Sequence, residues 1–169
     1  MNLRFKPSVT VAAVIEKDFD GVRKFLLVEE ETQDGLRLNN PAGHLDEGEG
    51  PVEGCARETL EETAFDFRPT ALIGVYLSRF EKKVRHQDEP QDITYLRFAF
   101  CGELGDEHVG RALDVGIVRV VWMTPDEIRA SADRHRSPLL VRCMDDYLAG
   151  KRYPLDCITV DPSVSRLDS

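Results

Sequence analysis

Apolar and β-branched residues gather in six short runs along the chain, and several of them alternate with polar residues. Such runs predict β-strands at residues 8–15, 24–30, 36–39, 71–78, 93–101 and 117–123. The first two runs are separated by Asp18-Phe19-Asp20-Gly21, which is typical of a hairpin turn. The connection at residues 81–92 is polar and dense in charge, so we expect a long loop there.

A different spacing marks the helices. Val52, Cys55, Ala56 and Leu60 recur at near-helical intervals after Gly50-Pro51, which predicts a helix over residues 51–63 with these side chains on its buried side. Pro125 begins a short helix, and Ser137-Pro138 begins a longer one that ends at Gly150. With no internal repeat and no linker in the sequence, the pattern predicts one α+β domain.

The composition narrows the class of protein. The chain has 169 residues, enough for one domain with a hydrophobic core. Its 41% hydrophobic and 31% charged residues exclude a disordered tail or a membrane protein. The net charge of −9 argues against binding to nucleic acid through a general electrostatic field. An anionic substrate would therefore need local basic residues or metal cations.

The sequence also bears on the cellular compartment. No apolar run approaches the roughly 18 residues of a membrane-spanning helix. The short apolar stretch after Arg4 and Lys6 leads directly into Glu16-Lys17 without a small-residue cleavage site, so we interpret it as a strand. Cys55, Cys101, Cys143 and Cys157 are scattered and form no CxxC pair, which is typical of reduced thiols. We expect a cytoplasmic protein without membrane attachment.

Acidic residues concentrate around the predicted helix at residues 51–63. Glu58, Glu61 and Glu62 stand at positions i, i+3 and i+4, so their side chains share one helix face and repel one another. Carboxylates are the oxygen ligands that Mg²⁺ and Mn²⁺ prefer, and a divalent cation would turn this repulsion into attraction. For an arbitrary Glu-x-x-Glu-Glu sequence, the commoner explanation is a solvated acidic face.

A longer pattern outweighs that explanation. Gly43, Glu49, Arg57, Glu58, Glu61 and Glu62 have the spacing of the signature box of the Nudix (MutT-like) hydrolases, G-x5-E-x7-R-E-U-x-E-E-x-G-U with U aliphatic, and the chain resembles this family. Two positions depart from the box. Thr59 replaces an aliphatic residue, and its methyl group can still pack. Ala64 replaces a glycine, and because a left-handed residue without glycine costs about 1–2 kcal/mol, we expect a slightly different helix exit.

The resemblance extends over residues 4–158. The segments Arg136-Ser137-Pro138-Leu139 and Arg152-Tyr153-Pro154-Leu155 lie outside the general signature and resemble a bacterial phosphatase subgroup of the family. The resemblance implies a single Nudix domain at residues 1–160 with a tail at 161–169. It also implies an α/β/α sandwich with a mixed central sheet and a smaller antiparallel sheet.

The resemblance further implies the roles of the box residues. Glu58 and Glu62 would bind Mg²⁺, with Mn²⁺ as a substitute and with Glu61 and the carbonyl of Gly43 as further ligands. Arg57 would orient Glu58 or Glu49 through a bidentate contact. Family members differ in the carboxylate that activates water, so Glu58 and a loop residue both stay open. Asp114 is our loop candidate, with Asp106 and Glu107 as substitutes and an ordinary turn carboxylate as the alternative.

A pyrophosphate substrate also needs a protein cation. Arg97 lies on the strand face away from Leu96, Phe98 and Phe100, so we expect it to bind substrate, although an exposed strand arginine would fit too. Arg37 is a weaker candidate of the same kind. The run Lys82, Lys83, Arg85 and His86 could bind a phosphate but is more typical of a soluble loop. The four histidines share no metal-ligand spacing, and no serine or cysteine stands in a nucleophile motif.

These features predict a Mg²⁺-dependent phosphohydrolase of nucleoside tri- and diphosphates, releasing orthophosphate. The subgroup resemblance adds hydroxymethylpyrimidine diphosphate as a substrate. The alternatives are hydrolysis of ADP-ribose or dinucleoside polyphosphates and, in another class, a Nudix-like binding module without turnover. The expected partner is a small nucleotide or pyrophosphate, with neither nucleic acid nor membrane, in a monomer or dimer.

Overall fold

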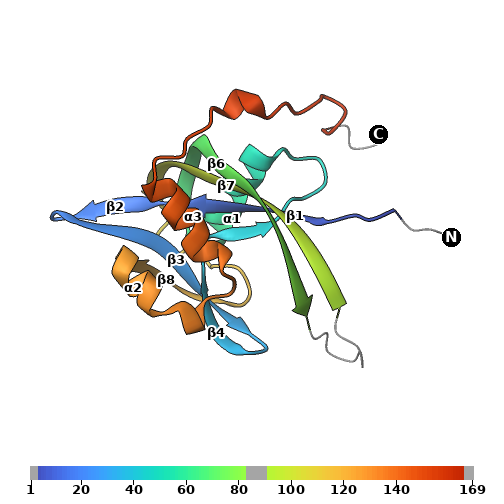
Figure 1. Ribbon diagram of the computed structural model, residues 1–169. Helices are drawn as coiled ribbons and strands as arrows, with labels where there is room; N and C mark the ends of the chain where they lie inside the picture. The colour runs from blue at the N-terminus through green and yellow to red at the C-terminus, as the bar shows by residue number, and fades with distance from the viewer. Residues whose placement is uncertain (1–3, 83–90, 166–169) are drawn as a thin grey trace.

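The computed structural model describes residues 4–82 and 91–165, which form two β-sheets and the helices around them (Figure 1). The mixed sheet has the strand order β5-β1-β7-β6. The antiparallel sheet has the order β2-β3-β4, with β8 paired to β3 on its other side. The elements follow one another along the chain as β1 (Ser8–Val14), β2 (Glu16–Phe19), β3 (Val22–Thr32), β4 (Gly35–Asn39), β5 (Ala42–His44), α1 (Pro51–Thr63), β6 (Phe65–Lys82), β7 (Gln91–Glu107), β8 (Ile117–Met123), α2 (Pro125–Ala130), η1 (Ala132–Arg134), α3 (Leu139–Leu148) and η2 (Leu155–Cys157).

The mixed sheet is built around β1. This strand pairs in parallel with β7, Ser8 opposite Tyr95, and antiparallel with β5, Thr10 opposite His44. Because neighbouring residues of a strand point to opposite faces, the sheet has two apolar sides. Val11 and Ala13 pack with Cys55 of α1 on one side, and Val14 packs with Cys143 of α3 on the other. This arrangement confirms the predicted α+β sandwich, and the two longest strands belong to the mixed sheet.

The antiparallel sheet begins with the predicted hairpin. Asp20 and Gly21 connect β2 to β3 with positive φ angles of 53° and 86°, the conformation that a tight two-residue hairpin turn requires. Further along β3, Glu29 is only 3% exposed and accepts hydrogen bonds from Arg119 of β8 (Nε to Oε2, 2.7 Å) and from Arg134 of η1. The hydrogen bond from Arg119, together with both positive charges, lowers the pKa of Glu29 despite its burial. One carboxylate thus joins three elements.

The structure corrects several predicted boundaries. β6 and β7 are much longer than the apolar runs at residues 71–78 and 93–101, and they extend into the stretch that we expected to be loop. Polar residues are tolerated at the described ends of the two strands, where Glu81 and Asp92 are exposed and Arg79 pairs with Asp92. Of the basic run, Lys82 ends β6, while Lys83, Arg85 and His86 lie outside the described residues. No described helix is long and apolar enough to span a membrane.

Candidate active site

Helix α1 carries most of the site. Gly50 stands at its N-cap and Pro51 in its first turn, where the missing N–H costs nothing. Thr59 is fully buried, and its hydroxyl donates to the carbonyl of Cys55 (2.8 Å), so the departure from an aliphatic residue packs as expected. Cys55 and Gly54 are buried on the same helix, which fixes the acidic face toward β5.

The end of α1 differs from our expectation. Ala64 adopts the left-handed conformation (φ 61°, ψ 14°), and its N–H donates to the carbonyl of Leu60 at 2.9 Å. The helix therefore ends with the geometry that glycine would give, and the backbone of Ala64 is strained. The carbonyl of Ala64 accepts from the N–H of His108 (2.8 Å) and Ala64 is nearly buried, so surrounding contacts hold this conformation in place.

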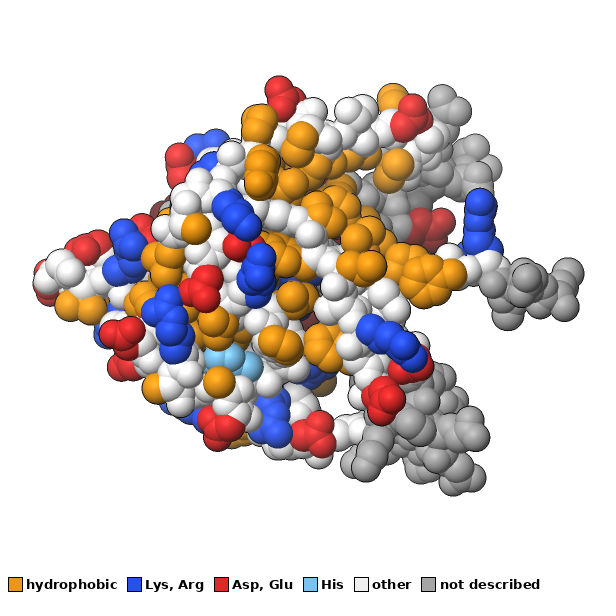
Figure 2. Space-filling model, in the orientation of Figure 1, with side chains coloured by type: hydrophobic (Ala, Val, Ile, Leu, Met, Phe, Trp, Pro, Cys, Tyr) orange, Lys and Arg blue, Asp and Glu red, His pale blue; other side chains and the backbone are white. Residues whose placement is uncertain are grey.

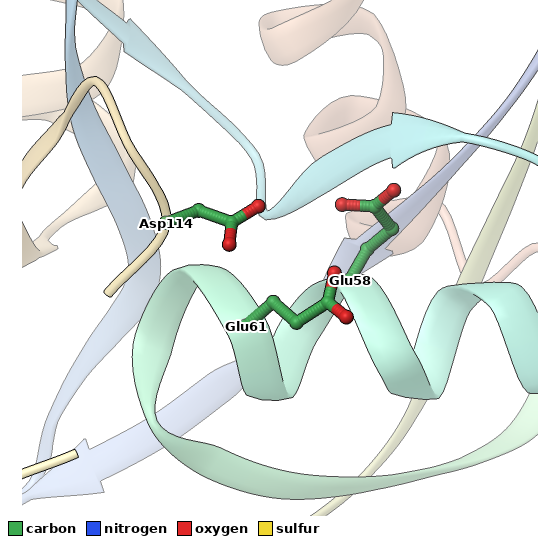
Figure 3. A group of neighbouring side chains, drawn as sticks. All are labelled: Glu58, Glu61 and Asp114. Atoms are coloured by element: carbon green, nitrogen blue, oxygen red, sulfur yellow. The ribbon is translucent and has the colours of Figure 1, made fainter. Parts of the chain in front are cut away.

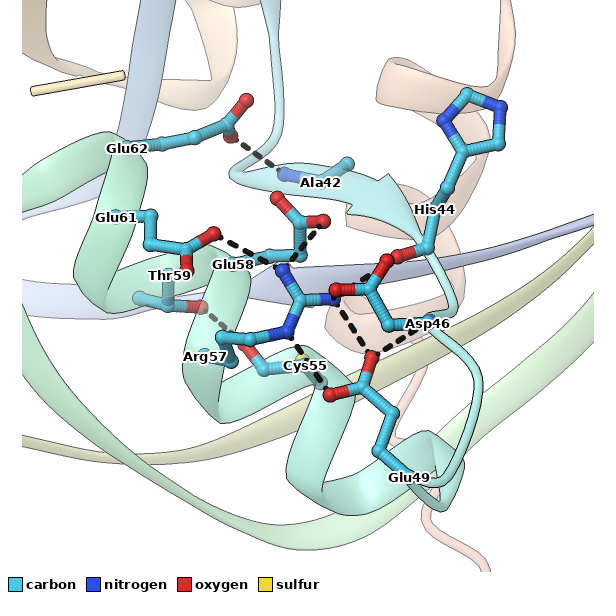
Figure 4. A network of polar contacts seen from close by, with 10 residues as sticks. All are labelled: Ala42, His44, Asp46, Glu49, Cys55, Arg57, Glu58, Thr59, Glu61 and Glu62. Carbon is cyan, nitrogen blue, oxygen red and sulfur yellow. Dashed lines mark hydrogen bonds and ion pairs between the residues drawn. The ribbon is translucent and has the colours of Figure 1, made fainter. Parts of the chain in front are cut away.

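Arg57 connects the loop before the helix to the acidic face of α1 (Figure 4). Its Nε and Nη2 donate to the two oxygens of Glu49 at 2.9 and 2.6 Å, the bidentate contact predicted for one of two glutamates. Its Nη1 donates to Glu58 (3.0 Å) and Glu61 (2.9 Å), and Nη2 also reaches the carbonyl of His44 (3.0 Å). The hydrogen bonds from Arg57 lower the pKa of Glu49, which stays ionised.

Gly43 lies directly over the carboxylate of Glu58. A Cβ atom at this position would stand 2.0 Å from Cδ of Glu58, so only glycine allows the approach. Burial raises the pKa of Glu58, and the nearby Glu61 and Asp114 add to this, while Arg57 opposes it. The fixed position of Glu58 therefore depends on the missing side chain of Gly43 as much as on Arg57.

Two further carboxylates converge beside Glu58. Oxygen atoms of Glu58, Glu61 and Asp114 all lie within 4.8 Å of one another (Figure 3). The loop before β8 brings Asp114 to α1, and its N–H donates to the carbonyl of Glu61 at 3.0 Å. Arg57 also contacts Glu58 and Glu61, but not Asp114, among the described residues. A set of hard oxygen donors with less positive than negative charge fits Mg²⁺ or Mn²⁺.

Glu62 lies next to this group but is held differently. One of its oxygens accepts the N–H of Ala42 at 2.8 Å, at the outer edge of β5. Burial, with a contribution from the charges of Glu58, Glu30 and Asp114, raises the pKa of Glu62 to about 8. The structure thus groups Asp114 with Glu58 and Glu61, and Glu62 stays a predicted ligand beside them.

Arg97 is buried, in contrast to the exposed strand arginine that was the alternative. Its side chain is 8% exposed, and Nε and Nη1 have no hydrogen-bond partner among the described residues. Burial lowers its pKa, and Cys143, Glu30 and Glu62 lie close enough to oppose that shift. A buried guanidinium with unused donors is costly unless a ligand satisfies it.

The other predicted residues lie elsewhere. Arg37 is on β4, and its Nη1 donates to the carbonyl of Leu36 at 3.2 Å. Asp106 and Glu107 belong to the end of β7 instead of a loop, and they are absent from the carboxylate group formed by the described residues. The antiparallel pairing of β7 with the start of β6, Glu107 opposite Phe65, extends the strand through them.

Sequence reasoning missed the surroundings of Arg97. Thr10 and Tyr76 flank it on β1 and β6, and the hydroxyl of Tyr76 donates to Asp146 of α3 at 2.8 Å. Alternation along residues 93–101 could have placed Tyr95 on the same face as Arg97. The pairing partners depend on the parallel contact between β1 and β7, which no local pattern reveals.

Comparison with known proteins agrees with this geometry. A family model described as NUDIX domain matches residues 6–143. The chain is 36% identical over 154 residues to the phosphatase NudJ of Escherichia coli K12, covering 91% of this chain and 92% of the relative. The solved structure of a NUDIX hydrolase from Nitrosomonas europaea has a TM-score of 0.80 and 46% identity, covering 92% of this chain and 98% of that one. The NUDIX domain of Shewanella oneidensis NrtR, solved with ADP ribose, is 17% identical (TM-score 0.61; coverage 85% and 90%) and supports the fold alone.

Proposed function

The chain belongs to the NUDIX hydrolase family, and from this premise we propose that it is a Mg²⁺-dependent phosphohydrolase that removes terminal phosphate from nucleoside tri- and diphosphates. The general class, a hydrolase of phosphoanhydride bonds, follows from the family and from the NudJ relative. The observation that carries the finer proposal is the convergence of Glu58, Glu61 and Asp114 within 4.8 Å.

We propose different roles for the side chains around α1. Glu58, Glu61 and Glu62 would hold the metal, with the carbonyl of Gly43 as a further ligand. The bound cation would neutralise charge on the phosphates and lower the pKa of water. Arg57 positions Glu58 and Glu61 and is itself held by Glu49. Glu58 and Asp114 are both candidates for the base that accepts the proton of the attacking water.

Arg97 supports attack at the chain end. Its unused Nε and Nη1 donors would satisfy the oxygens of a terminal phosphate, and Glu62 lies close enough to influence its pKa. We therefore propose orthophosphate as the main product from a nucleoside triphosphate, with hydroxymethylpyrimidine diphosphate as a further substrate. Arg37, whose guanidinium contacts Leu36, is a weaker candidate for substrate binding.

Product analysis tests this proposal. GTP, ADP-ribose and hydroxymethylpyrimidine diphosphate are incubated separately with the protein and Mg²⁺, with EDTA as the control. We expect orthophosphate from GTP, consumption of GDP and no turnover with EDTA. Pyrophosphate as the main product, or ADP-ribose hydrolysed ten times faster than the others, would contradict the terminal-phosphate proposal and favour the ADP-ribose or dinucleoside polyphosphate alternative. Absence of turnover on every substrate would favour a binding module.

The location of the enzyme is part of the proposal. Cys55, Cys101 and Cys143 are buried free thiols and Cys157 is an exposed one. Free thiols are typical of reducing compartments, so we place the enzyme in the cytoplasm. Fractionation of cells would test this assignment.

A further inference from the structure

Three aromatic side chains lie next to one another in space on the face of the mixed sheet that carries Arg97. The ring centroids of His44 and Tyr95 are 6.1 Å apart, and those of Tyr95 and Phe80 are 5.9 Å apart. His44 lies on β5, Tyr95 on β7 and Phe80 on β6, so three strands contribute one ring each. His44 is exposed, and Tyr95 and Phe80 are half-buried, which leaves part of their surface accessible.

Unsatisfied polar groups border the same rings. Ser78 is opposite Tyr95, and Thr10 is opposite Arg97, two positions along β7. The hydroxyl oxygens of Ser78 and Thr10 are buried without a hydrogen-bond partner among the described residues, as are two nitrogens of Arg97. Thr10 and Arg97 are 7% and 8% exposed. Unpaired buried polar atoms are rare in folded proteins, and a gathering of them beside partly accessible rings indicates a place for a ligand.

This surface begins beside the catalytic carboxylates. His44 follows Gly43, whose backbone lies over Glu58, and the carbonyl of His44 accepts from Arg57. The ring of His44 points away from the Arg57 network (Figure 4). Seen from the side of α3, hydrophobic side chains gather over β1, β6 and β7 (Figure 2). A substrate with its phosphates at Glu58 could therefore extend its organic group over the rings.

We propose that His44, Tyr95 and Phe80 form a stacking platform for the planar heteroaromatic ring of the substrate. Ser78, Thr10 and Arg97 supply hydrogen-bonding groups at its border. The chemistry fits a nucleobase or a substituted pyrimidine, because such rings combine a π face with polar edges. This assignment rests on the proposed function and names the substrate class: an aromatic pyrophosphate, in preference to an aliphatic or inorganic one.

Steady-state kinetics with two substrates tests the platform. GTP carries a ring and inorganic tripolyphosphate has the same phosphate chain without one. Tyr95→Leu keeps an apolar side chain but removes the π face, so we expect KM for GTP to rise about tenfold with kcat changed less than about twofold. KM for tripolyphosphate should stay within about twofold of wild type, since its contacts do not involve the ring. Phe80→Leu should act in the same direction.

Matched variants distinguish the loss of ring stacking from a structural effect of the substitution. Tyr95→Phe retains the ring and should restore KM for GTP to near wild type. Tyr153→Leu removes an exposed tyrosine from the segment after α3 and should leave both substrates unaffected. A rise of KM on both substrates, or an unchanged KM for GTP in Tyr95→Leu, would overturn the platform and leave these rings as packing between the hairpin strands.

A binding measurement keeps this inference independent of turnover. Protons of the guanine base in guanosine 5′-monophosphate should shift upfield in NMR spectra on binding to wild type, and the shift should disappear in Tyr95→Leu. Ring-current shifts without hydrolysis of any substrate would retain the platform and contradict the proposed activity. Hydrolysis of GTP without such shifts would retain the activity and contradict the platform.

Discussion

Glu49, Glu58 and Glu62 have the same side chain but different surroundings, and this separates what each can do. Hydrogen bonds from Arg57 lower the pKa of Glu49, so Glu49 is ionised and suited to holding the guanidinium of Arg57 in place. Burial raises the pKa of Glu58 and of Glu62, which makes their ionised forms costly without a compensating charge. A divalent cation is the simplest compensation, so Glu58 and Glu62 are the glutamates whose removal should affect catalysis most.

Glu58→Gln and Glu62→Gln should each lower kcat by at least about 10²-fold, because a charge-stabilising or proton-accepting group is lost. Stability should hardly change, since a repulsive charge leaves the helix. Phosphate release and thermal unfolding measure the two effects. Glu53→Gln, an exposed position on the same helix, is the control and should retain activity. Near-wild-type kcat values in both Glu58→Gln and Glu62→Gln would contradict the assignment of these two residues to the catalytic site.

Gly43→Ala tests the contact between backbone and carboxylate. The new Cβ would stand 2.0 Å from Cδ of Glu58, so the carboxylate must move. A displacement of about 1 Å at a reacting group can cost about 10²-fold in rate, and we expect a loss of that order in kcat. Circular dichroism should show a folded protein. Full activity of the alanine variant would mean that Glu58 acts from another position.

Arg97→Ala should raise KM for nucleoside triphosphates by about tenfold or more, since a charge-assisted hydrogen bond contributes about 1.5–3 kcal/mol. The KM of each substrate is compared with that of Arg37→Ala, a variant of the weaker candidate, which should change less. An unchanged KM in Arg97→Ala would leave Arg97 with a purely structural role.

At the scale of elements, α1 and most strands could be predicted because their signals are local. The spacing of Val52, Cys55 and Leu60 gives the helix its bounds, and alternation gives the strand cores. The i, i+3, i+4 spacing also predicted a common helix face for Glu58, Glu61 and Glu62. Asp114 was only one of three loop candidates, because its contact with Glu61 depends on a fold that places residue 114 beside residue 61. The ends of β6 and β7 were missed because described residues there, Arg79, Glu81 and Asp92, are polar and exposed and show no apolar alternation.

Ala64→Gly should stabilise the helix end. Alanine in the left-handed conformation is strained by about 1 kcal/mol, and glycine removes the strain. We therefore expect the free energy of unfolding, measured in urea, to rise by about this amount. Ala149, at the end of α3, has a φ of −71°, and Ala149→Gly should give no gain. Equal effects of the two substitutions would contradict the role of the left-handed conformation.

At the scale of the whole molecule, Glu29 joins β3 to β8 and to η1. Its contribution to the free energy of unfolding should depend on pH. Its pKa lies below the ordinary value of 4.5, so the ionised form is favoured by folding. This contribution is complete above pH 4.5 and is lost as the pH falls toward the folded pKa. Glu29→Gln should thus destabilise the protein by about 2 kcal/mol at pH 7 and by progressively less below pH 4.5. Urea unfolding at pH 7, 5, 4 and 3 measures this, and a pH-independent difference would contradict it.

The parallel contact between β1 and β7 also has a consequence in time. Residues 8–14 pair with residues 95–101, about half of the chain later. During synthesis the apolar first strand leaves the ribosome long before its partner exists, and it must wait without completing a sheet. Closing so large a loop costs conformational entropy before the contacts between the two strands can compensate for it. Folding is therefore slow compared with that of helical proteins of equal size. Asp114, which completes the carboxylate group with Glu58 and Glu61, follows β7 in the chain, so the site is assembled only after β7 has emerged.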